Sequence, residues 1–149
     1  FRGVVLADGF LGAIPPAAFE PTLSGLAKDP QAALSAFYGP MTTGSTHNAR
    51  VVREALGIPV AVLQAYLRSL TVDPLQGRKA ELRLPILQVA AGPVETDPAK
   101  AAGYLAEYGF GNVPTLRIVH LPQAKHWVMW DMPEAFLIAL RAFEAGLGR

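Results

Sequence analysis

The chain has 149 residues, of which 51% are hydrophobic and only 17% are charged, so it has enough apolar side chains to bury a core and is not predicted to be disordered. Thirteen Lys and Arg against twelve Asp and Glu leave a net charge of +1, which offers no basic surplus for nucleic acid. Cysteine is absent, which excludes disulfides and thiolate chemistry, and no apolar run approaches the roughly 20 residues that span a bilayer.

The first predicted strand covers residues 3–7 and ends at Asp8-Gly9. A region without a convincing strand follows. Its apolar spacing and prolines predict short helices near 16–27, 30–38, 46–56 and 59–70. Roughly 70 residues are too many for a simple crossover between two strands, so residues 10–81 are interpreted as a helical cap or lid over the sheet.

Residues 82–149 are expected to form the C-terminal core. They contain two predicted strands, 85–91 and 115–121, with a helix at 98–108 between them. A last helix follows Asp131, which is expected to cap it, with an apolar face at Phe136, Leu140 and Phe143. The alternation of strands and helices predicts an α/β fold with about three parallel strands. The first two strands are near-continuous apolar runs and are expected to be buried on both faces, whereas the third suits a sheet edge.

The opening Phe1-Arg2-Gly3-Val4-Val5 already has the character of a core strand. We therefore expect residues 1–149 to be part of a longer domain. A lone apolar edge on the first strand would otherwise be left open for pairing, either with a complementary N-terminal chain or with a second copy.

The most informative segment is Leu121-Pro122-Gln123-Ala124-Lys125-His126-Trp127, followed by a short apolar turn and a helix start at Pro133-Glu134. It resembles the histidine loop of the α/β-hydrolase fold. Residues 85–95 resemble the strand and acid loop of that fold, and residues 3–10 the strand that precedes its cap. The resemblance covers the chain in the family's order.

The resemblance implies hydrolysis by a nucleophile, a histidine base and a carboxylate, acting on a small ester, amide or related substrate without a cofactor or metal. His126 is the expected base, because histidine commonly exchanges a proton near neutral pH. The acid is left open between Asp8 and Glu95, with Asp97 behind them. Phe10 and Trp127 are the expected substrate contacts, and cap aromatics are expected to add to an apolar pocket.

The nucleophile is missing from the predicted site. The chain has no Gly-x-Ser-x-Gly elbow, and all four of its serines fall in the cap region. Ser45, in Gly44-Ser45-Thr46-His47, is interpreted as a helix-capping hydroxyl. The nucleophile is therefore expected outside this chain, and whether the chain is itself an enzyme is left open.

Two alternatives remain. The chain is a non-catalytic binding fragment, or it belongs to a haloalkane-dehalogenase-like or C–C hydrolase branch of the same fold. Neither nucleic acid nor a membrane is an expected partner. The sequence does not indicate the compartment, whether cytoplasmic, periplasmic or secreted.

Overall fold

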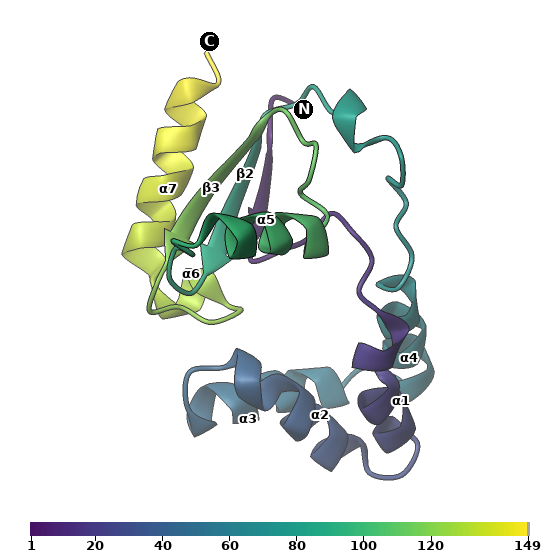
Figure 1. The fold of residues 1–149 in the computed structure, drawn as a ribbon. Coiled ribbons are helices and arrows are strands. Elements are labelled where there is room, and N and C mark those ends of the chain that lie inside the picture. Colours follow the sequence, from purple (N-terminus) through teal and green to yellow (C-terminus); the bar gives the residue numbers. More distant parts are fainter. Residues whose placement is uncertain (149) are drawn as a thin grey trace. The chain divides into compact units, whose positions relative to one another are not determined.

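The computed structural model describes residues 1–148, and the chain divides into two compact units (Figure 1). The first unit contains residues 1–12 together with the chain from residue 74 onward, and the second unit is Ala13–Asp73. The second unit is therefore an insertion between two strands of the first. The predicted cap at 10–81 contains this unit and extends beyond it at both ends.

The first unit is built on three parallel strands, β1 (Val4–Ala7), β2 (Ile86–Ala91) and β3 (Leu116–Leu121). Their order is β1-β2-β3, so β2 is the central strand. The register aligns Ala7 with Val89 and Ala91 with Leu121, which brings the carboxyl ends of the strands to one edge of the sheet. The predicted α/β class with three parallel strands is confirmed.

The first strand is more exposed than expected. β2 is buried for five of its six residues, but Val4 and Val5 on β1 are 36% and 39% exposed. The expectation of burial on both faces was wrong for β1, because within residues 1–148 β1 pairs with β2 on one side and with no strand on the other.

Helices cover both faces of the sheet. The helix α7 (Pro133–Gly146) places Ala139 and Phe143 against Leu87 and Val89 of β2. The opposite face, which carries Gln88, is crossed by α5 (Pro98–Glu107) (Figure 1). A short helix, α6 (Val128–Asp131), lies between β3 and α7, and a 3-10 turn covers Lys79–Glu81.

Two predicted helix caps differ from the structure. Asp131 does not cap α7, whose N-cap is Met132 without a side-chain hydrogen bond. The Asp131 carboxylate instead accepts a hydrogen bond from the Lys125 amide, because Asp131 is the last residue of α6. Ser45 is likewise not a cap, since α3 has Gly44 at that position.

The second unit is entirely helical. Its elements are 3-10 turns at Pro16–Ala18 and Gly39–Met41 and the helices α1 (Glu20–Leu26), α2 (Pro30–Tyr38), α3 (Ser45–Leu56) and α4 (Val60–Ser69). Apolar side chains from these helices form a separate core, namely Phe19, Leu26, Leu34, Val52, Ala55, Leu63 and Leu67. The unit therefore has its own hydrophobic interior, while its role as a cap stays a prediction.

Candidate active site

Asp8 stands immediately after β1, in the left-handed backbone region with φ = +50°. This conformation is uncommon outside glycine and is held by local bonds. The Asp8 amide donates to the carbonyl of Val89 at 2.8 Å, and its Oδ1 accepts the Ala91 amide at 2.8 Å. The carboxylate is thus fixed at the carboxyl edge of the sheet.

His126 lies in the loop after β3 and meets Asp8 there. Its Nδ1 is 3.0 Å from Oδ2 of Asp8, with the two side chains 46% and 23% exposed. An ionised carboxylate only accepts hydrogen bonds, so Nδ1 is the donor in this pair. When the ring is neutral, the other nitrogen, Nε2, is an acceptor and is able to take a proton from another group.

The loop that carries His126 is held from both ends. The Ala124 amide donates to the carbonyl of Leu121 at 3.1 Å, and the Lys125 amide donates to Asp131 at 2.7 Å. The His126 ring also meets Trp127 edge-on, with centroids 5.0 Å apart. These contacts restrain the loop close to His126, which favours a defined position for the imidazole.

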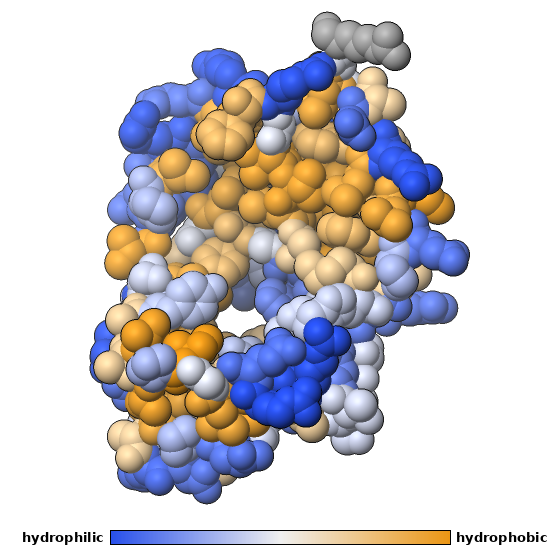
Figure 2. Space-filling view, turned by 180° about the vertical axis from the view of Figure 1, so that it is seen from behind, coloured by the Kyte–Doolittle hydropathy of each residue, from blue (hydrophilic) through white to orange (hydrophobic). Residues whose placement is uncertain are grey.

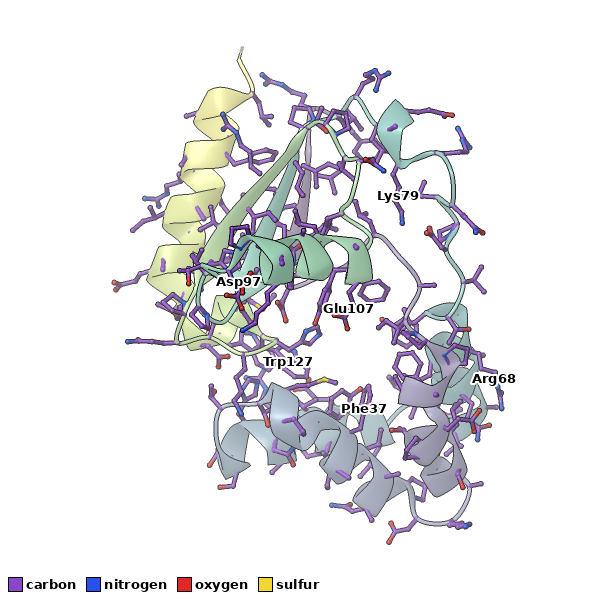
Figure 3. The ribbon with its side chains drawn as sticks, viewed as in Figure 1. Phe37, Arg68, Lys79, Asp97, Glu107 and Trp127 are labelled. Carbon is purple, nitrogen blue, oxygen red and sulfur yellow. The ribbon has the colours of Figure 1, made fainter. Side chains whose placement is uncertain are left out.

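The other candidate acids have local partners. Glu95 is exposed and accepts the Asp97 amide at 2.9 Å. Asp97 caps α5 by accepting the Ala99 amide at 2.8 Å, at the helix start labelled in Figure 3. Of the three carboxylates considered from the sequence, the structure brings Asp8 to His126, whereas Glu95 and Asp97 bind backbone at the start of α5.

The predicted substrate contacts, Phe10 and Trp127, are both half-buried in the first unit. Trp127 stacks on Trp130 at 6.1 Å between centroids and 19° between planes. Among the cap aromatics, Phe19 is in the core of the second unit and Phe37 packs against it. Substrate contact by Phe10 and Trp127 stays a prediction.

Two polar side chains near Asp8 were missed in the sequence. Gln88, in the middle of β2, is fully buried, and its Nε2 donates to the carbonyl of Gly9 at 3.0 Å. Burial raises the pKa of Tyr104 above its ordinary value; a hydrogen bond with Gln88 lowers that pKa in part, and the Asp8 charge raises it. A glutamine inside an otherwise apolar strand was the available signal.

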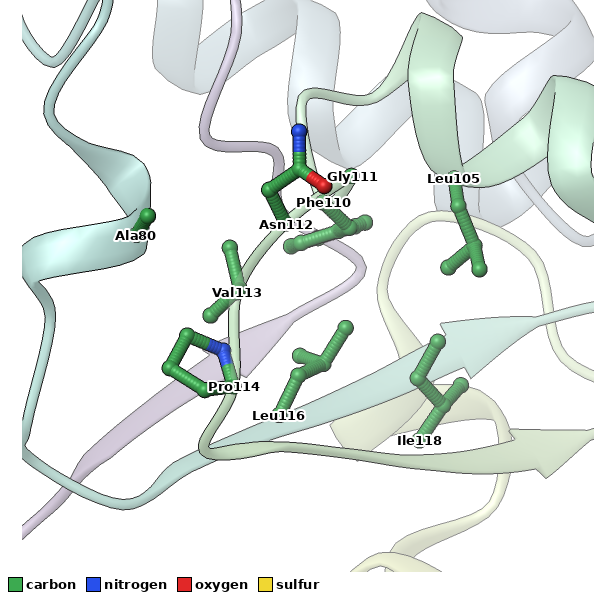
Figure 4. A pocket seen from close by; sticks show the side chains of 9 residues that line it. All are labelled: Ala80, Leu105, Phe110, Gly111, Asn112, Val113, Pro114, Leu116 and Ile118. Carbon is green, nitrogen blue, oxygen red and sulfur yellow. The ribbon is translucent and has the colours of Figure 1, made fainter.

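The pocket shown in Figure 4 lies elsewhere. It has a volume of about 630 Å³ and contains neither Asp8 nor His126. Its lining comes from the start of β3, the loop before it, Leu105 of α5 and Ala80. We therefore do not assign this pocket to the Asp8–His126 pair.

Residues 1–148 contain neither a candidate metal site nor a helix that could span a membrane. No group of three or more His, Cys, Asp or Glu side chains is arranged to hold a metal ion. Over the same residues, none of the helices has the length and apolar character needed to cross a bilayer.

The sequence has no match among protein-family models or among curated proteins. In structure, the chain is similar to a hydrolase from Pseudomonas aeruginosa PA01, with a TM-score of 0.73 and 18% sequence identity. The similarity covers 95% of this chain and 55% of the other, so this chain spans little more than half the length of that protein. At this identity, the similarity establishes a shared α/β fold.

Proposed function

We propose that this chain carries the histidine base and the carboxylate of a hydrolase that acts through a nucleophile, a histidine and an acid. The observation that carries the proposal is the 3.0 Å contact between Nδ1 of His126 and Oδ2 of Asp8, at the carboxyl edge of a parallel sheet. That edge is where open α/β sheets usually place their sites. The fold shared with a protein described as a hydrolase supports the same reaction class.

The proposed roles follow from the two ring nitrogens. Nε2 of His126 takes the proton of the nucleophile as that group attacks the carbonyl carbon of an ester or amide. His126 then returns the proton to the leaving group, and a water molecule repeats the sequence to release the acid. Asp8 accepts a hydrogen bond from Nδ1–H throughout without becoming protonated itself, which fixes the tautomer and stabilises the imidazolium.

The nucleophile is proposed to come from outside the 149 residues. All four serines, Ser24, Ser35, Ser45 and Ser69, are in the second unit on helical segments, and none follows a strand. The similar hydrolase is longer than this chain, which is consistent with a further segment in the complete site. No cofactor is needed for the proposed steps.

The test replaces the base in the intact protein. With a short-chain 4-nitrophenyl ester as the substrate, His126→Ala is expected to lower kcat by at least about 10³-fold, because it removes proton transfer in both steps. The matched control is His47→Ala, since His47 is in the second unit and contacts Thr43. Turnover that survives in His126→Ala would refute the assignment.

The identity of the nucleophile separates two branches of the proposal. A serine would be labelled covalently by a fluorophosphonate probe in the intact protein, and labelling would weaken in His126→Ala. An aspartate nucleophile would give no label and would instead release halide from a haloalkane. The serine branch is our proposal, and halide release without labelling would replace it.

A second candidate function is association through the open edge of β1. Val4 and Val5 are partly exposed there, and α7 of the same unit exposes Leu137 and Ile138. Figure 2 shows hydrophobic side chains gathered over the upper part of the view, which is the first unit. We propose that this edge pairs with a complementary strand or with a second copy. A monomer in sedimentation experiments on the isolated chain would contradict pairing with a second copy.

A further inference from the structure

Gln88 is a polar side chain in an apolar place. It is 0% exposed in the central strand, between Leu87 and Val89, which pack into the core on the other face of the sheet. A carboxamide that is buried without hydrogen bonds costs free energy, so such a residue usually has a specific partner. Its partner is the carbonyl of Gly9, at 3.0 Å from Nε2.

The orientation of the Gln88 amide is fixed by its neighbours. If the amide were turned over, Oε1 would face the Gly9 carbonyl, and two acceptors would be in contact. In the orientation observed, Nε2 donates to Gly9 and Oε1 has no hydrogen-bond partner. An apolar residue would avoid that unpaired acceptor. The unpaired Oε1 therefore costs free energy, and the hydrogen bond to Gly9 is the interaction that offsets it.

Gly9 directly follows Asp8, the residue with φ = +50°. The Asp8 amide is bound to Val89 and its Oδ1 to Ala91, and the carbonyl of Gly9, in the peptide unit between Gly9 and Phe10, is bound by Gln88. A displacement of Gly9 would alter the backbone angles of Asp8 and shift Oδ2. The Gln88 amide restrains Gly9 by holding its carbonyl to the centre of the sheet.

We propose that Gln88 is a positioning residue, which acts through Gly9 to hold Asp8 where its carboxylate meets Nδ1 of His126. The Gln88 side chain donates its hydrogen bond to the Gly9 carbonyl, so Gly9 is the contact through which Gln88 acts on Asp8. This inference rests on the proposed function for its catalytic meaning. Its structural content, that Gln88 controls the Asp8–His126 contact, is testable without a substrate.

The test reads the tautomer of His126 by ¹⁵N NMR of histidine-labelled protein, at a pH where the ring is neutral. The chain has three histidines, so the signals are assignable by single substitutions. In the unaltered protein, Asp8 is expected to hold His126 as the Nδ1–H tautomer. Gln88→Met removes the donor at similar size and is expected to lower the ratio of Nδ1–H to Nε2–H about fivefold.

The matched control is Gln64→Met. Gln64 also donates its side-chain amide to a carbonyl, that of Leu23 at 3.4 Å, but in the second unit. It should leave the His126 tautomer unchanged. Thermal stability of Gln88→Met is expected to change little, because the substitution removes the unpaired Oε1 together with the donor. A tautomer shift at nearly constant stability is the signature of positioning rather than of general destabilisation.

An unchanged tautomer ratio in folded Gln88→Met overturns the inference. If that variant does not fold, the inference is tested in the unaltered protein instead. A through-hydrogen-bond NMR coupling between Nε2 of Gln88 and the Gly9 carbonyl carbon is expected, and its absence beside visible couplings within β2 also overturns the inference. The proposed function fails separately, through persistent turnover in His126→Ala, so the two failures are distinguishable.

Discussion

Asp8 and His126 are 118 positions apart in the sequence, and their Oδ2 and Nδ1 atoms are 3.0 Å apart. The strands before them, β1 and β3, are not neighbours, because β2 runs between them. The Asp8 carboxylate bridges this gap, since Oδ1 accepts the amide of Ala91 at the end of β2 and Oδ2 reaches the histidine. The Asp8 carboxylate therefore connects the end of β1 with the end of β2 and with the loop after β3. Its position depends on all three strands of the sheet.

The first prediction concerns Asp8→Asn in the intact protein. The amide oxygen of an asparagine is able to accept a hydrogen bond from the Ala91 amide, but its NH₂ group cannot accept one from Nδ1–H of His126. The ring then adopts the wrong tautomer, and kcat is expected to fall by roughly 10⁴-fold with a small change in KM. Steady-state kinetics with the 4-nitrophenyl ester measure both constants.

The matched controls for Asp8→Asn are the other two acids. Glu95→Gln and Asp97→Asn each keep an acceptor for the backbone amide that the native side chain binds. Both are expected to stay within about threefold of the parent in kcat/KM, because neither group touches His126. A large loss in Glu95→Gln with none in Asp8→Asn would show that the acid has been assigned to the wrong strand.

The carboxylate that contacts His126 could be predicted only in part from the sequence. Its candidates were found from their places after predicted strands, but choosing between Asp8 and Glu95 depended on which loop approaches His126. Strands and helices were predictable because their apolar periodicity is local. The misassigned cap at Asp131 and the exposed β1 had a different origin, since each depends on which partner the rest of the fold supplies. Gln88 was missed because its role lies in one long-range hydrogen bond.

The second prediction tests the loop that carries His126. Asp131→Ala removes the acceptor of the Lys125 amide, one residue before the histidine. The imidazole is then less well placed, and kcat is expected to fall about 10- to 100-fold. Asp131→Asn is the control, because its amide oxygen still accepts the bond and most activity should remain. Equal losses in both variants would mean that the charge, rather than the bond, matters.

The third prediction concerns a close approach of two backbones. Gly109 has φ = +74°, and a Cβ there would overlap the backbone of Gly12. Gly109→Ala is therefore expected to lower the free energy of unfolding by at least about 3 kcal/mol, through strain and overlap together. Gly77→Ala is the control, with the same φ of +74° but open space around it, and should cost about 1–2 kcal/mol. Chemical denaturation measures both, and equal losses would contradict the overlap.

The last prediction is a decline in stability at alkaline pH. Burial is the main cause that raises the pKa of Tyr38, Tyr104 and Tyr108 above the ordinary 10.0. A raised pKa means that the folded protein holds these protons more tightly than the unfolded chain does. The stabilisation they contribute is complete below pH 10 and is lost as the pH rises through the folded-state values.

The measurement is the drop in Tm between pH 8 and pH 11, compared between the parent and the triple variant Tyr38→Phe, Tyr104→Phe and Tyr108→Phe. The parent and the triple variant share all their other ionisable groups, so the effect of those groups cancels in the comparison. The triple variant is expected to show the smaller drop, because its rings have no proton to lose. Equal drops would mean that burial of these three hydroxyls does not couple their ionisation to folding.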